Sequence, residues 1–267
     1  MFYIHFTELR INYLNYLITR GPVGRLSERR GKPVVELKSL GNLKGVPKEF
    51  IPDLSSSNRS ILLQYTPKGT YWSNRVRQIQ ALQIEQQKLL STWKSIYKNS
   101  PRYIEYPLHL PGTNHFDKAF FDKLVPNLNP IPIEAENSIN KPKSRSKNEV
   151  LAYDIITDMG YEAKQEARLN LPFIDSFNAF FPDLSIYVPE IERTIFSELD
   201  GAVDNPRYLR HSIERQSNYF TQGFDEFKDV FFYRINSPYT FDATLFRNLF
   251  YITVEQTAEN IIHQIFG

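Results

Sequence analysis

Apolar residues recur with a helical period in one long stretch of the N-terminal half, from Tyr71 to about Lys98. This stretch contains no proline or glycine, and the spacing of its apolar positions is near 3.5 residues. Upstream, residues 32–38 and 59–65 are predicted strands, separated by a stretch that contains glycine and proline. The pattern therefore predicts a small module of strands and one long helix. The apolar positions of the helix are Val76, Ile79, Leu82, Leu89, Leu90, Trp93, Ile96 and Tyr97.

The pattern in the C-terminal half begins with a helix that opens at Ser146 and closes at Gly160. Ser146 and Glu149 have the spacing of a capping box, and a run of apolar residues follows them. Three predicted strands come next, and a short turn over residues 189–192 makes the last two antiparallel neighbours. The predicted strands cover residues 161–171, 180–188 and 193–200.

Two further helices and a strand complete the pattern. Asn205 and Pro206 are typical of a helix start, and Gly223 is typical of its end. A buried strand over 230–235 and a final helix over 242–265 follow. The resulting order, α-β-β-β-α-β-α, predicts an α/β fold with three layers around a mixed sheet.

A proline-rich segment separates the two halves. Residues 101–145 hold 7 of the 17 prolines and end in a polar, basic stretch. We therefore expect a basic N-terminal module over residues 1–100, a linker over 101–145 and a second domain over 146–267.

Composition narrows the class of protein. The chain has 267 residues, of which 41% are hydrophobic and 23% charged, as in an ordinary soluble globular protein. Because it contains no cysteine, disulfide scaffolds, Cys-ligated metal centres and thiolate nucleophiles are excluded. Since there is neither a basic leader before an apolar run nor a long uninterrupted apolar stretch, we expect a cytoplasmic protein without a membrane partner.

Charge is distributed unevenly along the chain. Residues 1–100 hold 16 basic and 6 acidic residues, whereas residues 149–267 hold 9 and 19, so the two parts carry about +10 and −10. Either the basic part binds a polyanion while the acidic part collects carboxylates around cations, or the two parts neutralise each other. Under the first interpretation the partner is a nucleic acid, either DNA or RNA. The residues expected to contact it are Arg25, Arg29, Arg30, Lys32, Arg75, Arg77 and Lys88.

Carboxylates gather on the predicted strands of the C-terminal half. Asp183 and Glu198 fall on neighbouring antiparallel strands, and the two-residue period of a strand places Asp200 on the same face as Glu198. Unpaired acids on one strand face are costly to bury unless a cation neutralises them, and Mg²⁺ prefers such oxygen ligands. Glu149 either caps its helix or reaches the same metal through water.

These residues, in this order, carry a resemblance to a known family. Glu149, then Phe181-Pro182-Asp183, then Ser197-Glu-Leu-Asp-Gly201 resemble the motifs of the PD-(D/E)XK nuclease superfamily over roughly residues 144–255. The resemblance implies a restriction-endonuclease-like core and an endonuclease that hydrolyses DNA with Mg²⁺ or Mn²⁺. It further implies that Asp183, Glu198 and the backbone carbonyl of Leu199 hold the metal.

One position departs from the superfamily's pattern. Asp200 stands where its lysine is expected, so a group on the following helix would have to support the attacking water, and we favour Gln216 slightly over Arg215. Asp200 would then hold a second metal or a metal-bound water. The expected catalytic set is Glu149, Asp183, Glu198, Asp200 and Gln216. The alternative is a catalytically inactive nuclease-fold protein that binds DNA or a protein partner, as a homodimer or in a defence or transposition complex.

Overall fold

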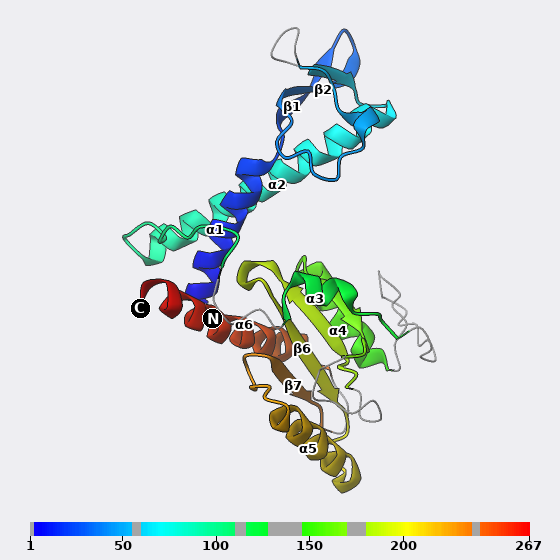
Figure 1. Ribbon diagram of the computed structural model, residues 1–267, viewed down its shortest axis with the longest axis vertical. Helices are drawn as coiled ribbons and strands as arrows, with labels where there is room; N and C mark the ends of the chain where they lie inside the picture. The colour runs from blue at the N-terminus through cyan, green and yellow to red at the C-terminus, as the bar shows by residue number, and fades with distance from the viewer. Residues whose placement is uncertain (1–2, 55–59, 110–115, 128–145, 170–179, 237–240) are drawn as a thin grey trace. The chain divides into compact units, whose positions relative to one another are not determined.

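A computed structural model describes residues 3–54, 60–109, 116–127, 146–169, 180–236 and 241–267 (Figure 1). The chain divides into two compact units, one formed by Thr7–Tyr106 and the other by Met1–Phe6 with Pro107–Gly267. The fold is α/β, with an antiparallel sheet in the first unit and a mixed sheet in the second.

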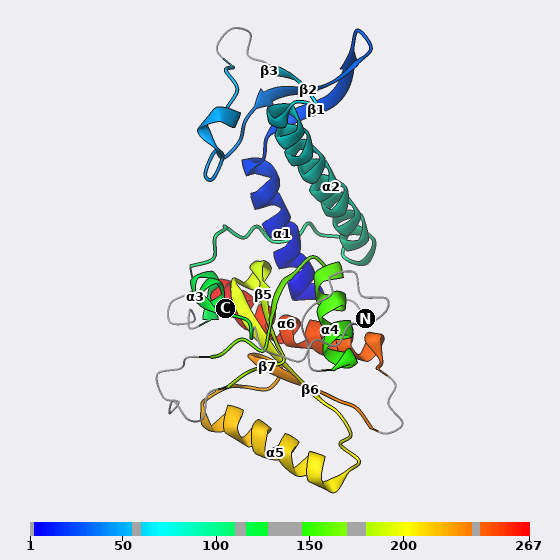
Figure 2. The same cartoon turned by 90° about the vertical axis from the view of Figure 1, so that its right-hand side faces the viewer.

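The N-terminal unit is a three-stranded sheet packed on a long helix (Figure 2). Val35 and Leu37 of the central strand are fully buried against Trp72 and Val76 of the helix. The indole of Trp72 also donates to the carbonyl of Phe50 at 2.7 Å. The elements of this unit are α1 (Ile4–Arg20, whose first residues group with the other unit), β1 (Val23–Arg29), β2 (Lys32–Ser39), η1 (Lys48–Phe50), β3 (Ser60–Leu63) and α2 (Pro67–Ile96).

A tight hairpin joins β1 to β2. Arg29 pairs with Lys32, so only Arg30 and Gly31 form the turn, and both have positive φ angles of 51° and 72°. Two successive left-handed residues are typical of the type I′ turn, whose twist matches that of the flanking strands. From the sequence this stretch was interpreted as a basic cluster, and neither β1 nor α1 was predicted.

From residue 146 onward, the C-terminal unit has the element order that the sequence predicts. Its sheet runs β4-β5-β6-β7, antiparallel except for the parallel pair of β6 and β7, which α5 connects. Ser146 and Asn205 cap α4 and α5 as expected. The elements are α3 (Lys118–Lys123), α4 (Lys147–Asp158), β4 (Glu162–Gln165), β5 (Leu184–Val188), η3 (Pro189–Ile191), β6 (Arg193–Asp200), α5 (Pro206–Thr221), β7 (Val230–Arg234) and α6 (Ala243–Phe266).

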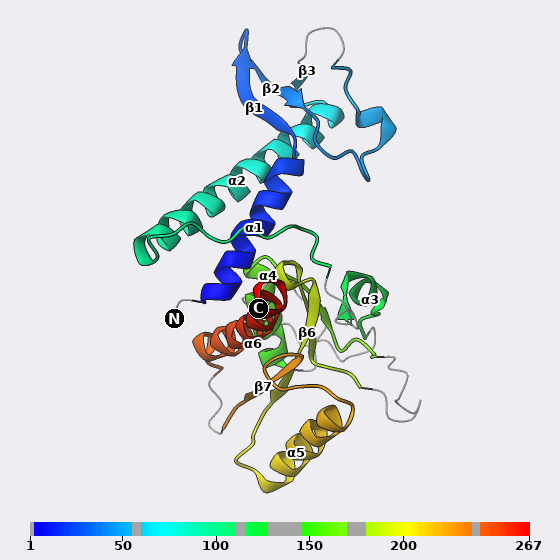
Figure 3. The same ribbon diagram turned by 60° about the vertical axis from the view of Figure 1, so that its left-hand side comes forward.

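Helices cover both faces of this sheet (Figure 3). On one face α4 and α6 pack, and Phe246 and Phe250 of α6 contact the ring of Phe231 in β7. On the other face Tyr219 of α5 and Phe121 of α3 belong to a mainly aromatic core. β6 thus lies between helical layers, so the polar side chains near its end must find partners within the protein.

The boundary between the units differs from the expected linker over 101–145. Residues up to Tyr106 belong to the N-terminal unit, where Arg102 bonds to Glu8 and the amide of Ile104 donates to Asn12. In the C-terminal unit, α3 and Leu124 pack on the sheet. Proline content alone does not identify a linker, because extended segments that pack against a domain also contain proline. Residues 128–145, including the polar end of the expected linker, lie outside the described part.

Candidate metal centre

Asp183 and Glu198 lie at one end of the neighbouring strands β5 and β6. The register pairs Leu184 with Ser197, so it continues to place Asp183 opposite Glu198. The amide of Leu199 donates to Oδ2 of Asp183 at 2.6 Å. The metal-holding role expected for the Leu199 carbonyl stays a prediction, since the hydrogen bond to Asp183 is made by the Leu199 amide. This bond fixes the orientation of the Asp183 carboxylate.

Two further acids join Asp183. One carboxylate oxygen from each of Glu149, Glu166 and Asp183 lies within 4.8 Å of the other two. Glu166 directly follows β4 with a φ of 43°, and its amide donates to the carbonyl of Asp183 at 3.2 Å. Asn127 donates to Oε2 of Glu166 at 2.8 Å. Three backbone segments thus bring three carboxylates to one point.

Glu149 takes part in the cap of its helix, which is one of the two roles that the sequence left open. Its amide donates to Oγ of Ser146 at 3.2 Å, which is the cap of α4. The hydroxyl of Ser146 in turn donates to Oε1 of Glu149 at 2.9 Å. The cap therefore holds the glutamate at the start of the helix, where its carboxylate also belongs to the acidic cluster.

Glu198 is held by α5. Its side chain is almost fully buried, with Arg215 Nη1 at 2.7 Å from Oε2 and the Tyr219 hydroxyl at 2.6 Å from Oε1. Both carboxylate oxygens therefore accept hydrogen bonds from the helix.

Asp200 faces the same helix. Ser212 donates to its Oδ2 at 2.5 Å, and Arg215 Nη1 lies 3.6 Å from its Oδ1. Gln216, which the sequence analysis favoured for supporting water, instead donates to Glu226 at 3.0 Å and accepts from Arg234 at 2.7 Å. The structure therefore places Arg215, rather than Gln216, against the carboxylates of β6.

The surroundings of Asp183 disfavour the charged form of its carboxyl group. Burial, followed by the carboxylates of Glu198 and Glu149, raises the pKa of Asp183 well above its ordinary value of 3.8, against the opposing effects of the Leu199 amide and Arg215. Burial also raises the pKa of Glu198, although Arg215 and Tyr219 oppose this. Burial alone would lower the pKa of Arg215, but the neighbouring carboxylates raise it.

This donor set fits a hard divalent cation. Mg²⁺ takes oxygen ligands about 2.1 Å away in an octahedral arrangement, which sets opposite ligands about 4.2 Å apart. Adjacent ligands of such an octahedron lie about 3.0 Å apart, and the oxygens of Glu149, Glu166 and Asp183 all lie within 4.8 Å of one another. A cation at this point would also offset the neighbouring negative charges, which add to burial in raising the pKa of Asp183. Of the residues expected from the sequence, Glu149 and Asp183 belong to this group, whereas Glu198 is engaged by α5.

Sequence reasoning missed Glu166 and Tyr219. Glu166 lies within the strand predicted over residues 161–171, whereas β4 ends at Gln165. An acid on the strand next to that of Asp183 was the available signal. Tyr219 was not among the residues expected at the site, and its ring packs in the aromatic core. Its hydroxyl is the only polar part of that side chain, and nothing in the pattern indicates where it points.

The expected nucleic-acid-binding residues lie in the N-terminal unit. Arg25 and Arg29 are in β1, Arg30 is in the turn, and Lys32 begins β2. The other three, Arg75, Arg77 and Lys88, lie on α2, where Arg75 bonds to the carbonyl of Asn42 and stacks near Trp72. The two groups are therefore on different elements of the unit.

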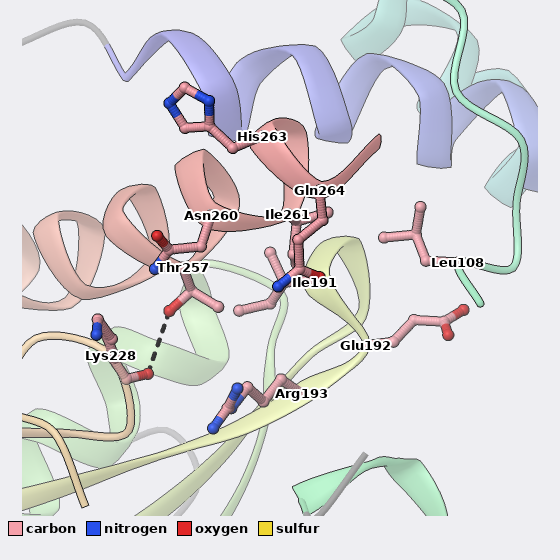
Figure 4. Close-up of a pocket in the computed structure, with 10 residues that line it drawn as sticks. All are labelled: Leu108, Ile191, Glu192, Arg193, Lys228, Thr257, Asn260, Ile261, His263 and Gln264. Atoms are coloured by element: carbon pink, nitrogen blue, oxygen red, sulfur yellow. Dashed lines mark hydrogen bonds between the residues drawn. The ribbon is translucent and has the colours of Figure 1, made fainter. Parts of the chain in front are cut away.

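A separate pocket of about 430 Å³ opens near the start of β6 (Figure 4). Its cations already have acidic partners, since Arg193 pairs with Asp229 and Lys228 Nζ lies 2.9 Å from Asp225. Because Arg193 and Asp200 are the first and last residues of β6, this pocket is distinct from the acidic cluster. The lining residues are Leu108, Ile191, Glu192, Arg193, Lys228, Thr257, Asn260, Ile261, His263 and Gln264.

Among the described residues, no helix combines the length and the apolar character that crossing a bilayer requires. Comparison of the chain with protein-family models, with curated proteins and with solved structures gave no match.

Proposed function

We propose that the C-terminal unit is a Mg²⁺-dependent or Mn²⁺-dependent nuclease of the PD-(D/E)XK type that hydrolyses DNA phosphodiester bonds. The observation that carries this proposal is the meeting of Glu149, Glu166 and Asp183, with one oxygen of each within 4.8 Å of the others. The cluster stands at the strand ends of an α-β-β-β-α-β arrangement, as the motif order would require. In this proposal the three carboxylates hold the cation.

A bound divalent cation would neutralise charge on the scissile phosphate and lower the pKa of water. The protein's own contribution is to hold the carboxylates rigidly. Asp183 is oriented by the Leu199 amide, Glu149 by the hydroxyl of Ser146, and Glu166 by Asn127. Because each acid has a hydrogen-bond donor of its own, the cluster is preorganised and needs little rearrangement to receive an ion.

Arg215 is the candidate to replace the lysine that is absent at Asp200. Its guanidinium lies 2.7 Å from Glu198 and 3.6 Å from Asp200, and its side chain is 40% exposed. Arginine keeps its proton at neutral pH, so it cannot act as a base. It can neutralise Glu198 and stabilise negative charge that develops on a phosphate beside the cluster.

The same contact favours a second candidate function. If Arg215 neutralises Glu198 permanently, the chain keeps a nuclease fold that binds DNA without cutting it. Both functions include DNA binding, so affinity for DNA does not separate them.

The test is cleavage of a supercoiled plasmid by the full chain with Mg²⁺, with Mn²⁺ and with EDTA. We expect nicking that requires the metal and is lost in Asp183→Ala, while Glu214→Gln, which changes an exposed carboxylate on α5, retains it. Calorimetric titration with Mg²⁺ supplies a second readout, in which Asp183→Ala should lose binding. Metal binding without cleavage would support the inactive alternative, and absence of both would refute the proposed site.

A further inference from the structure

One face of the sheet in the N-terminal unit is turned away from its helix and carries cations. Leu26 of β1 packs into the core with Val35 and Trp72. By the two-residue period of a strand, Arg25, Ser27 and Arg29 lie on the opposite face. Their contacts confirm this, because all three reach Glu36 of the neighbouring strand. The period places Lys32 and Lys38 of β2 on this open face as well.

Glu36 is the centre of this face. It is only 5% exposed, although it lies among arginines that are well exposed. Oε2 accepts from Arg25, with Nε at 3.1 Å and Nη2 at 3.0 Å, while Oε1 accepts from Ser27 at 3.0 Å and lies 3.5 Å from Nε of Arg29. The Ser27 hydroxyl, followed by the arginines, lowers the pKa of Glu36. One charged carboxylate therefore holds two guanidinium groups in place.

The contact between Arg25 and Glu36 uses only one edge of the guanidinium group, so the other edge can contact a ligand. Arg25 uses Nε and Nη2 toward Glu36, so Nη1 lies outside this pair, and the side chain is 67% exposed. An arginine held on one side by a carboxylate presents its other edge in a fixed direction. Such an edge can make two parallel hydrogen bonds to O6 and N7 of guanine, the commonest specific contact in the major groove.

The cations of α2 are arranged differently. Arg75 is engaged inside the unit by Asn42, Tyr71 and Trp72. Arg77 contacts Asn74 and Gln64. Lys88 lies 11 residues beyond Arg77, which is about three helical turns or ~16 Å. These three residues do not form one cluster, whereas Arg25 and Arg29 share a single carboxylate.

We propose that the open face of β1 and β2 binds duplex DNA in the major groove, and that Arg25, positioned by Glu36, reads guanine there. The major groove is about 12 Å wide and admits a two-stranded ribbon, whose strands are ~4.8 Å apart. Arg29, Lys32 and Lys38 flank Arg25 and supply charge for the phosphates on either side. The choice of DNA as the polyanion rests on the proposed function.

The first experiment asks whether the chain selects a sequence. The full protein, in EDTA so that no cleavage occurs, is incubated with a pool of randomised duplexes, and the bound fraction is sequenced. We expect enrichment of guanine at a fixed position. If no base is enriched at any position of the bound duplexes, the proposal is wrong. Tighter binding of RNA duplexes or of single strands than of the selected DNA duplex would also overturn it.

The second experiment separates base reading from simple attraction. Arg25→Lys keeps the positive charge but cannot make the paired contact, so it should lose about tenfold or more of the preference for the selected duplex over a scrambled one while its salt dependence stays unchanged. Glu36→Gln removes a negative charge from the face. It should bind scrambled DNA as tightly as the wild type or more tightly, yet lose preference for the selected site. Unchanged preference in both variants would refute the role of the pair.

A matched control tests which element of the N-terminal unit binds the DNA. Arg77→Ala combined with Lys88→Ala removes two charges from α2, as Arg25→Ala combined with Arg29→Ala removes two from the open face. We expect the pair on the sheet to lower affinity more than tenfold and the pair on α2 to lower it much less. The reverse ranking would assign binding to α2. Circular dichroism of each variant verifies folding.

The outcome does not depend on catalysis. Sequence selection is measured without metal, so a protein that never cuts DNA can still confirm the sheet face. Conversely, metal-dependent nicking by a chain that selects no sequence would support the proposed function and refute this inference.

Discussion

Nη1 of Arg215 lies 2.7 Å from Oε2 of Glu198 and joins helix α5 to strand β6 through one charged hydrogen bond. The carboxylate is 2% exposed, whereas the arginine side chain is 40% exposed. The buried partner depends on this contact more than the exposed one does, since an unpaired buried charge is far costlier than an unpaired surface charge.

Replacement of Arg215 should therefore affect both stability and activity. Arg215→Ala removes the cation beside Glu198, and we expect a loss of about 1–3 kcal/mol in the free energy of unfolding. Cleavage should fall by about 100-fold or more if the guanidinium stabilises charge on the phosphate. Urea unfolding and nicking rates measure the two effects. Gln216→Ala is the control, because its amide contacts Glu226 and Arg234 instead, and equal losses in both variants would contradict a specific role for Arg215.

Removal of one oxygen from Tyr219 tests the second bond to Glu198. Tyr219→Phe keeps the ring, whose centroid is 4.8 Å from that of Phe180, but removes the hydroxyl that donates to Oε1. We expect a destabilisation of about 1–2 kcal/mol at neutral pH and a smaller one in acid, where Glu198 binds a proton and needs the donor less. Urea unfolding at both pH values measures this difference. A pH-independent loss would indicate a packing effect instead.

Asp183→Asn should stabilise the metal-free protein at neutral pH. Because the folded state raises the pKa of Asp183, the protonated form contributes stability that is fully present below the ordinary pKa and is lost as the pH rises through the raised value. Asparagine removes this loss, while its carbonyl can still accept from Leu199. We expect a gain of about 1 kcal/mol or more, since each pKa unit corresponds to ~1.4 kcal/mol.

Thermal unfolding in EDTA measures that gain, and calorimetry with Mg²⁺ should show weaker binding in the same variant. Glu214→Gln, on the exposed side of α5, should change neither quantity. A destabilised Asp183→Asn protein would show that the acidic cluster is not under repulsion.

The N-terminal unit has its own buried ion pair. Glu8 is 2% exposed and accepts from Arg102, with Nη2 at 2.7 Å and the backbone amide at 2.5 Å. Glu8→Gln should cost about 2–4 kcal/mol, because it removes the buried negative charge and replaces one acceptor oxygen with an amide group that faces the donors of Arg102. Glu85→Gln, which weakens a more exposed pair with Arg10, should cost less than about 1 kcal/mol. Urea unfolding followed by circular dichroism compares them, and equal losses would contradict the importance of burial.

Periodicity predicted the C-terminal unit well because its signals are local. Ser146 and Asn205 cap the expected helices, and β6 covers residues 193–200 as predicted. β4 is shorter than the expected strand, since it ends at Gln165 and Glu166 turns the backbone with a positive φ. Part of that expected strand, residues 170–171, lies outside the described residues.

The candidate site could be predicted only in part. Asp183 and Glu149 stand out because short motifs mark them, whereas the approach of Glu166 depends on the pairing of β4 with β5. Arg215 and Gln216 are adjacent in sequence, so their side chains leave α5 in directions about 100° apart. The sequence does not show which of the two directions faces the carboxylates of β6. Helix α1 was missed because Thr7, Glu8 and Asn12 are buried along it, which weakens the apolar pattern.

Both tryptophans of the chain, Trp72 and Trp93, lie within the Thr7–Tyr106 unit, and each indole donates to a backbone carbonyl there. Tryptophan fluorescence therefore reports on this unit alone, because the unit with the acidic cluster contains tyrosine but no tryptophan. An emission change on addition of DNA would originate near the sheet and α2. Addition of Mg²⁺ should leave the same signal constant, so one spectrum distinguishes events in the two halves of the molecule.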